Sequence, residues 1–204
     1  FKHFMRVLAL DLSTKTGWAI LDAIELVSSD YRVDLCQYGV IRNDDKDEKL
    51  INLKNYQFDD INKVLKFIEF LSKNVLNLIE IYQPNEIVIE QTNPGRHFGL
   101  IQKLLEWIHY QVLLSIINYF NNKNPIYLAS SEWRSILDLK LSKDQKSHNK
   151  FVKFKKKKNK ITIKHLAVLK ANELYNLNLK LKDNDKADAI LLGTAYLKKY
   201  YGFN

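Results

Sequence analysis

Four acidic residues stand where a carboxylate could do chemistry. Asp11 ends one apolar run, Glu90 ends another, and Asp185 and Asp188 lie three residues apart near the C-terminus. Hard oxygen donors, with no partner cysteine and no histidine at ligand spacing, suit Mg²⁺ or Mn²⁺ and not zinc. Two such ions would activate a water and stabilise the leaving oxygen of a phosphodiester cleavage. The acids therefore indicate a metal-dependent phosphodiester hydrolase, with all four as catalytic residues and metal ligands.

Each acid also has an ordinary explanation when it is taken alone. A strand-end carboxylate such as Asp11 can face water or cap a turn, and the helix dipole favours an acid such as Asp185 in a first helical turn. However, a carboxylate is costly to bury unless a cation or a donor compensates it. Four acids in equivalent contexts favour a shared cation site.

The elements that would position these acids follow from hydrophobic patterning. An apolar run, a polar turn with one glycine and a second apolar run, over residues 4–20, predict a strand, a tight turn and a returning strand. The further expected strands are 31–41, 86–90 and 125–129. The expected helices are 58–82, 98–120, one containing residues 132–134, 161–176 and 183–200. The order predicts an α/β fold with a five-stranded mixed sheet, three antiparallel strands and then parallel strands, flanked by helices.

This arrangement would bring the acids together. Asp11 and Glu90 end strands that we expect to be adjacent and parallel, and open α/β sheets place their sites at the carboxyl ends of such strands. Asp185 and Asp188 share one face of the last helix, close to its apolar stripe. Ser130 or Ser131 is the expected cap of the helix that carries Arg134.

The charge is concentrated in one segment. The net charge is +9 and the pI is 9.4, but residues 140–164 alone hold eleven lysines and one acid, a balance of +10. The rest of the chain is therefore close to neutral. A basic arm at about 139–160 on a near-neutral body predicts a polyanionic partner, nucleic acid before membrane. The alternative is a solvated, partly disordered lysine run.

The composition fits one globular unit. The chain has 204 residues, 46% of them apolar, and we expect one domain over 1–204 with the basic arm as an insertion. No apolar stretch reaches the roughly 18 residues of a membrane span, and no signal-peptide pattern is present. Cys36 is the single cysteine, expected to be buried in a reducing compartment. We expect a cytoplasmic protein, in the host cytoplasm if a phage encodes it.

The motifs resemble a known family. Asp11 in its strand-turn-strand, Ile87-Val88-Ile89-Glu90-Gln91 and Asp185-Lys186-Ala187-Asp188-Ala189 look like the RuvC family of Holliday-junction resolvases, in the RNase H-like superfamily. Phage-type members are the most similar, through Asn-Pro-Gly-Arg after Glu90, Leu105-Glu106-Trp107-Ile108-His109 and Ser131-Glu132-Trp133-Arg134. In two places the chain departs from the bacterial pattern: Leu-Ser-Thr-Lys follows Asp11 in place of Pro-Gly-Ser-Arg, and Asn93 replaces an aromatic residue that works at the junction.

The resemblance implies a function and an assembly. It implies an RNase H-like fold, two Mg²⁺ or Mn²⁺ ions per site, and a homodimer that cuts four-way DNA junctions, with helix 98–120 at the dimer interface. The expected DNA-binding residues are Lys15, Arg96, His97, Phe98, Arg134, Lys153, Lys155, Lys156, Lys157 and Lys158. Three of them have plainer alternatives: Lys15 as a solvated turn lysine, His97 as a surface residue and Phe98 as a core residue.

Three other functions compete with this interpretation. A sugar-kinase or actin-like ATPase shares the opening Asp-x-small-Thr pattern, but it needs a second glycine-rich phosphate loop, and the six glycines here are not clustered. An RNase H-like protein that only binds branched DNA would be favoured by a missing acid, and none is missing. A nuclease for RNA–DNA hybrid, flap or fork substrates stays open. The sequence gives no cleavage-site preference.

Overall fold

The computed structural model describes residues 4–25, 31–42, 61–91, 100–120, 124–152 and 160–202, and the statements below concern these residues. The strands are β1 (Phe4–Asp11), β2 (Thr16–Glu25), β3 (Tyr31–Ile41), β4 (Glu86–Gln91) and β5 (Ile126–Ala129). The helices are α1 (Ile61–Tyr82), α2 (Leu100–Tyr119), α3 (Ser130–Ile136), α4 (Lys143–Val152), α5 (Ile163–Tyr175) and α6 (Asn184–Tyr201), the last preceded by a 3₁₀ turn at Leu181–Asp183. Of these elements, α4 was not predicted, and it falls within the basic arm.

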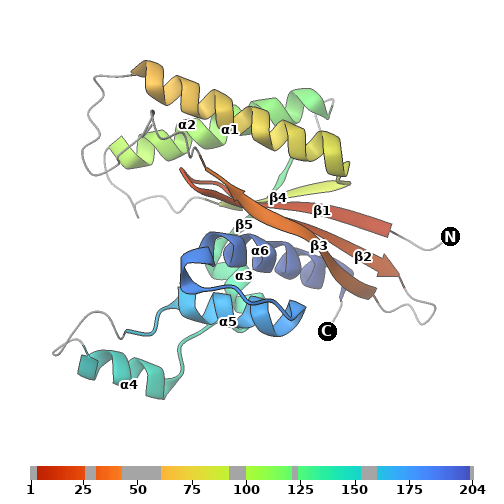
Figure 1. Ribbon diagram of the computed structural model, residues 1–204. Helices are drawn as coiled ribbons and strands as arrows, with labels where there is room; N and C mark the ends of the chain where they lie inside the picture. Colours follow the sequence, from red (N-terminus) through yellow and green to blue (C-terminus); the bar gives the residue numbers. More distant parts are fainter. Residues whose placement is uncertain are drawn as a thin grey trace.

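The five strands form one mixed sheet in the order β3-β2-β1-β4-β5 (Figure 1). β1 pairs antiparallel with β2 and β2 with β3, whereas β4 runs parallel to β1 and β5 runs parallel to β4. Parallel neighbours need a crossover, and α2 provides it between β4 and β5. The predicted mixed sheet, with three antiparallel strands followed by parallel ones, is confirmed.

Helices cover both faces of the sheet. α1 and α2 lie on one face, and α6 lies on the other with α3 and α5 (Figure 1). The side chains of β1 divide between these layers: Val7 and Ala9 join the core under α6, while Leu8 and Leu10 join the core under α1 and α2. A strand buried on both faces reads as a continuous apolar run, which explains the pattern before Asp11.

Helix α6 is embedded in the fold along most of its length. Every residue from Ala187 to Leu197 is buried. Gly193 permits this close approach, because a Cβ atom there would overlap the side chain of Leu21 and crowd Ala9 on the sheet. The sheet therefore fixes the position of α6. It also fixes the position of Asp185 and Asp188 in the first two turns of this helix.

Two hydrogen bonds between Arg6 and Asn85 align β4 with β1. The backbone N–H of Arg6 donates a 2.7 Å hydrogen bond to Oδ1 of Asn85, and the backbone N–H of Asn85 donates a 2.8 Å hydrogen bond to the carbonyl of Arg6. The ladder then pairs Val7 with Glu86 and continues to Leu10 with Ile89. This register brings the last residue of β1 level with Glu90.

Helix α2 buries one face only. Leu104, Ile108, Val112 and Ile116 are buried, four residues apart each time, as expected for one side of a helix. The side chains of Leu105, Leu113 and Ile117 are only partly covered, and Tyr110 is exposed. No described helix, α2 included, is both long and apolar enough to cross a membrane.

The prediction that Cys36 is buried was wrong. The thiol is exposed, because Cys36 is the extra residue of a β-bulge: Ile20 pairs with Gln37 and Leu21 pairs with Leu35. β3 is also the edge strand of the sheet. An apolar run does not reveal a bulge, so the error could not be seen in the sequence.

The predicted serine cap of α3 was also wrong. The helix begins at Ser130, and its N-cap residue is Ala129, whose side chain makes no capping hydrogen bond. Ser130 is buried within the helix, and Ser131 is exposed. The strand β5 runs directly into α3, which leaves no loop position for a capping serine.

Candidate functional site

The ends of β1 and β4 bring two of the predicted acids together. Asp11 is the last residue of β1, and it lies next in the parallel ladder after the Leu10–Ile89 pair, level with Glu90. The pKa of Asp11 is raised well above its usual value, first by burial and then by the negative charges of Glu90, Asp188 and Asp185. The other three predicted acids therefore all act electrostatically on Asp11 at the carboxyl end of β1.

Helix α6 supplies the other two acids from its first turns. Asp188 has 6% of its surface exposed, and its pKa is raised to about 6 by burial and by the charge of Glu90, with a smaller contribution from Asp185. Asp185 is half-buried. Asp11 and Asp188 are therefore each affected by the charges of the other predicted acids, and the role of the four acids as catalytic residues and metal ligands stays a prediction.

Gly17 has a role in this site that the sequence did not show. It pairs with Asp11 across the β1–β2 ladder. A Cβ atom on Gly17 would overlap the backbone carbonyl of Asp185. The glycine is therefore required for close approach of the first turn of α6 to the strands, and not for the turn that precedes it.

Trp133 holds one oxygen of Glu90. Its side chain is completely buried, and its indole Nε1–H donates a 2.9 Å hydrogen bond to Oε2 of Glu90. Trp133 belongs to the predicted Ser131-Glu132-Trp133-Arg134 motif, which by itself indicates no role for the indole. The available signal in the sequence was a tryptophan shortly after the strand expected beside the Glu90 strand. A buried indole N–H group needs an acceptor, and Glu90 is a nearby one.

Lys15 contacts an acid of the cluster. Its Nζ lies 2.6 Å from Oδ2 of Asp185 and also donates a 3.4 Å hydrogen bond to the carbonyl of Lys182. The second oxygen of Asp185 accepts a 2.6 Å hydrogen bond from Nδ2 of Asn184. Lys15 is therefore not a purely solvated turn lysine, because it forms an ion pair with one of the predicted acids.

Two further cations act on the cluster, and the sequence analysis missed one of them. Lys164, in the first turn of α5, lowers the pKa of both Asp11 and Asp188 through its charge. Arg134 lowers the pKa of Asp188, and its guanidinium lies 4.8 Å above the ring of Trp133. In the sequence, Lys164 is only one of the eleven lysines of residues 140–164. It lies 24 positions from Asp188, so nothing there connects the two residues.

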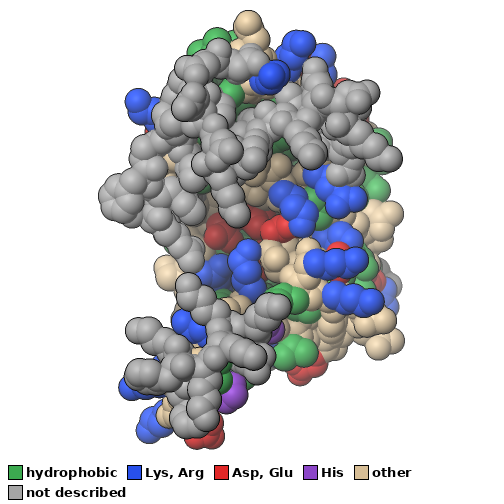
Figure 2. Space-filling view, turned by 60° about the vertical axis from the view of Figure 1, so that its left-hand side comes forward, with side chains coloured by type: hydrophobic (Ala, Val, Ile, Leu, Met, Phe, Trp, Pro, Cys, Tyr) green, Lys and Arg blue, Asp and Glu red, His purple; other side chains and the backbone are tan. Residues whose placement is uncertain are grey.

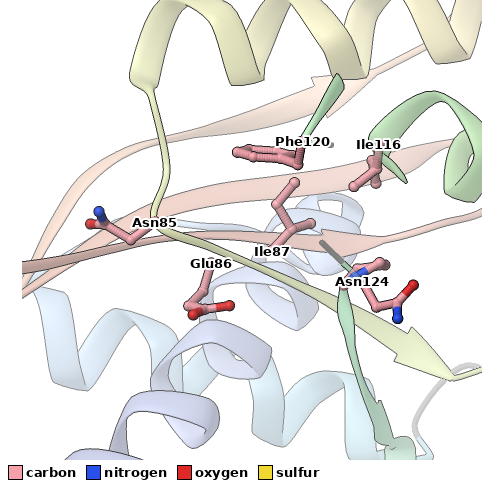
Figure 3. A pocket seen from close by; sticks show the side chains of 7 residues that line it. Asn85, Glu86, Ile87, Ile116, Phe120 and Asn124 are labelled. Atoms are coloured by element: carbon pink, nitrogen blue, oxygen red, sulfur yellow. The ribbon is translucent and has the colours of Figure 1, made fainter. Parts of the chain in front are cut away.

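Acidic side chains gather near the middle of one face of the molecule, with Lys and Arg side chains around them (Figure 2). This is the charge pattern expected where a phosphate backbone must approach a cation site. A small hollow lies at the amino ends of β4 and β5 (Figure 3). It has room for about one water molecule and is lined by Asn85, Glu86, Ile87, Ile116, Phe120, Asn124 and Pro125. Its position at the amino ends of β4 and β5 separates it from the carboxylates.

Carboxylate oxygens are the ligands that a hard divalent cation prefers. The four acids are not arranged around a cation in this structure. Oxygen-only donors and the raised pKa values of Asp11 and Asp188 both favour a bound cation. In the described parts of the chain, however, no three His, Cys, Asp or Glu side chains converge closely enough to hold a metal as they stand. Lys15 and Trp133 each occupy a carboxylate oxygen that a metal would use.

Several predicted DNA-binding residues lie outside the described residues. These are Arg96, His97 and Phe98 after β4, and Lys153, Lys155, Lys156, Lys157 and Lys158 of the basic arm. Their roles stay predictions. Lys15 and Arg134 are the two members of that set that the structure describes, and both act on the acid cluster.

Comparison with solved structures finds a similar fold. The structure of Thermus thermophilus RuvC matches with a TM-score of 0.61 at 13% sequence identity, covering 97% of each chain. T. thermophilus RuvC in complex with Holliday junction substrate matches with a TM-score of 0.57 at 11% identity, covering 97% of this chain and 98% of that chain. Sequence comparison gives no match to a protein-family model or to a curated protein. The chain therefore has the RNase H-like α/β fold of RuvC, to which it is structurally similar at low sequence identity.

Proposed function

We propose that the protein is a metal-dependent, structure-selective endodeoxyribonuclease that resolves four-way and other branched DNA junctions. The observation that carries this proposal is the convergence of Asp11, Glu90, Asp185 and Asp188 at the carboxyl end of the sheet. The fold supports the proposal, because one of its structural neighbours, T. thermophilus RuvC, has been solved in complex with Holliday junction substrate.

The four carboxylates would hold two Mg²⁺ or Mn²⁺ ions. When bound, these ions would supply an activated water and charge stabilisation of the leaving oxygen. Asp11 is the central ligand in this proposal, because the other three acids all act on it. Trp133 keeps Glu90 in one orientation through its indole hydrogen bond. Asp185 would have to exchange Lys15 for a metal ion.

The cations around the acids would bind the DNA backbone. Arg134 and Lys164 already act on Asp188, so a phosphate placed beside the acids would lie within reach of both charges. Lys15, released from Asp185, would add a third contact. The proposed contacts outside the described residues are Arg96, His97, Phe98 and the arm lysines Lys153 and Lys155 to Lys158. Such contacts give affinity and salt dependence without sequence readout.

We also propose that the protein acts as a homodimer with α2 in the interface. The partly covered Leu105, Leu113 and Ile117 on α2 support this, because they form an apolar surface beside the buried face of the helix. Two copies of the site would be needed for paired cuts on opposed strands of a junction. Sedimentation equilibrium of the purified protein would test the assembly directly.

The decisive experiment offers the purified protein a labelled four-way junction, a linear duplex and an RNA–DNA hybrid, with Mg²⁺, with Mn²⁺ or with EDTA. The expected result is cutting of the junction that requires the metal and disappears in Asp188→Asn. Preferential cutting of the hybrid would replace junction resolution with an RNase H-type function. Binding of the junction without any cutting would support a non-catalytic branched-DNA binding protein, the second candidate, which the Lys15–Asp185 ion pair favours.

A further inference from the structure

Helix α4 presents three lysines on one side. Lys143, Lys146 and Lys150 are all exposed. At about 100° per residue, their side chains fall within about 60° of one another around the helix axis. Asp144 lies about 100° or more from each of them, outside this stripe. No ion pair with another described residue neutralises the three ammonium groups. Among the described residues, the stripe is therefore a row of positive charge without a paired acid.

A neighbouring side of α4 is tied to the segment that leads into α5. Asn149 has only 8% of its surface exposed, and its amide makes two hydrogen bonds with the backbone of Ile161. Nδ2 donates to the carbonyl of Ile161 at 2.7 Å, and the N–H of Ile161 donates to Oδ1 at 2.8 Å. Gln145 and Val152, on the same side as Asn149, are partly buried. This clamp determines which side of α4 faces outward.

The start of α4 and the start of α5 each have a local cap. At its start, the N–H of Gln145 donates to Oγ of Ser142, and the N–H of Ser142 donates to Oε1 of Gln145, an arrangement that caps the helix. Beyond the clamp, Thr162 and His165 form a similar cap at the start of α5. An otherwise isolated ten-residue helix with a polar sequence would be marginal, so these contacts account for its formation.

The position of α4 in the chain connects it to the catalytic acids. The segment leaves the site at Arg134 and returns to it at Lys164, and both of these cations act on Asp188. Between them α4 stands apart from the layer formed by α5 and α6 (Figure 1). A DNA backbone that contacts Arg134 and Lys164 would therefore run close to the base of α4.

We propose that α4 is an accessory DNA-binding helix whose stripe of Lys143, Lys146 and Lys150 contacts the phosphate backbone of a duplex arm beside the cleaved strand, and that Asn149 is its positioning residue. This inference rests on the proposed function. Lys143 and Lys150 are about 10 Å apart along the helix axis. This span covers more than one phosphate of a DNA strand, at about 3.4 Å of duplex axis for each phosphate.

The first test measures how the affinity for a labelled four-way junction depends on salt, by fluorescence anisotropy with Ca²⁺ in place of Mg²⁺. The triple variant Lys143→Ala, Lys146→Ala, Lys150→Ala should lower the slope of log K against log salt by about 2 to 3, at about 0.9 for each lost contact. A comparison triple variant on the other helical layer, Lys66→Ala, Lys73→Ala, Lys103→Ala, removes the same formal charge from exposed positions, of which Lys73 is paired with Glu69, and should change the slope by less than 1. Equal slopes for the two triples would overturn the inference.

The second test addresses the clamp. Asn149→Ala keeps every lysine, yet it should lower junction affinity several-fold and reduce the salt slope, because α4 is no longer held. In the background of the α4 triple variant, Asn149→Ala should have no further effect on the slope. An unchanged slope in the single variant, or a full additional loss in the combined variant, would contradict a positioning role. Thermal unfolding of each variant would show that the body of the protein is folded.

These results are separable from the outcome for the proposed function. A wild-type protein that binds no DNA would refute the junction-binding function and the inference together. A wild-type protein that cuts junctions and binds them with a steep salt dependence, while the α4 triple behaves as the control triple does, would refute the inference alone.

Discussion

The indole Nε1–H of Trp133 donates a 2.9 Å hydrogen bond to Oε2 of Glu90. This contact joins α3 to β4 in the interior, since no part of Trp133 is exposed. It also removes one rotational freedom from an acid that the proposed mechanism uses as a metal ligand. The orientation of Glu90 is therefore set by a residue that follows it by 43 positions in the chain.

Trp133→Phe should test this orientation. The donor to a carboxylate is lost, which costs about 1.5 to 3 kcal/mol of unfolding free energy. The phenyl ring is also smaller than the buried indole, and the space that it leaves adds to this loss. Junction cleavage should fall and the Mg²⁺ concentration for half-maximal cleavage should rise. Trp18→Phe is the matched control, since the Trp18 ring packs near Tyr82 and away from the acids. Unchanged metal dependence in Trp133→Phe would show that Glu90 needs no such support.

The carboxylate cluster predicts an unusual dependence of stability on pH. Asp11 and Asp188 have raised pKa values in the folded protein, so the folded state holds protons that the unfolded chain releases near pH 4. In EDTA, the contribution of Asp188 to stability is therefore greatest below about pH 4 and is lost as the pH rises through about 6. For Asp188 alone the loss is up to about 3 kcal/mol.

Urea unfolding of the wild type and of Asp188→Asn between pH 4 and 7.5 would measure this effect. The variant cannot ionise at position 188, so its stability relative to the wild type should increase with pH in EDTA. Saturating Mg²⁺ should remove much of that advantage, because a bound cation stabilises the ionised wild-type cluster. A constant difference across the pH range would mean that Asp188 ionises freely in the folded protein.

Lys15→Gln should make the metal site easier to fill. Nζ of Lys15 lies 2.6 Å from Oδ2 of Asp185, and 42% of the Lys15 side chain is exposed, so the ion pair itself contributes at most about 1 kcal/mol to stability. Removing the lysine frees that oxygen, and the Mg²⁺ concentration for half-maximal cleavage should fall several-fold. Junction affinity should fall modestly through the lost charge. Lys182→Gln, at a neighbouring exposed position, serves as the control, and a higher metal requirement in Lys15→Gln would refute competition between lysine and metal.

Gly17→Ala should damage the site through the backbone of α6. The added Cβ would overlap the carbonyl of Asp185, and such overpacking costs about 1 to 3 kcal/mol. Cleavage should fall by a larger factor than the loss of stability explains, because Asp185 and Asp188 move with the helix. Gly39→Ala is the comparison: its Cβ would crowd the Trp18 ring, at 2.8 Å from three ring atoms. Thermal unfolding and cleavage rates together distinguish the two, and equal activity losses would remove Gly17 from the site.

Much of the fold followed from local patterns in the chain. The apolar run before Asp11, the alternation over residues 31–41 and the helical spacing over residues 61–82 each reflect contacts within one element, so their periodicity is visible in the sequence. The parallel pairing of the strands that end in Asp11 and Glu90 could also be anticipated, since adjacent parallel strands end at the same edge of a sheet. The presence and the order of the strands were therefore predictable.

The failures arose where a residue's surroundings come from distant parts of the chain. Cys36 is exposed because a bulge displaces it from the ladder, and its neighbours in sequence carry no sign of the bulge. Lys164 acts on Asp11 and Asp188 because α5 packs beside α6, which no spacing rule reveals. The hydrogen bonds between Asn149 and Ile161 likewise join residues 12 positions apart, and no pattern in the sequence indicates that these two residues meet.

The sequence by itself determined which acids are available, the strands and helices that carry them and the basic character of the arm, because residue type and periodicity are local properties. Only the tertiary structure decided how those acids are held: Trp133 on Glu90, Lys15 on Asp185 and the backbone of Asp185 against Gly17. The physical reason is that hydrogen bonds, ion pairs and steric overlap act over a few ångströms in space. Chain separation carries little information about which groups come that close.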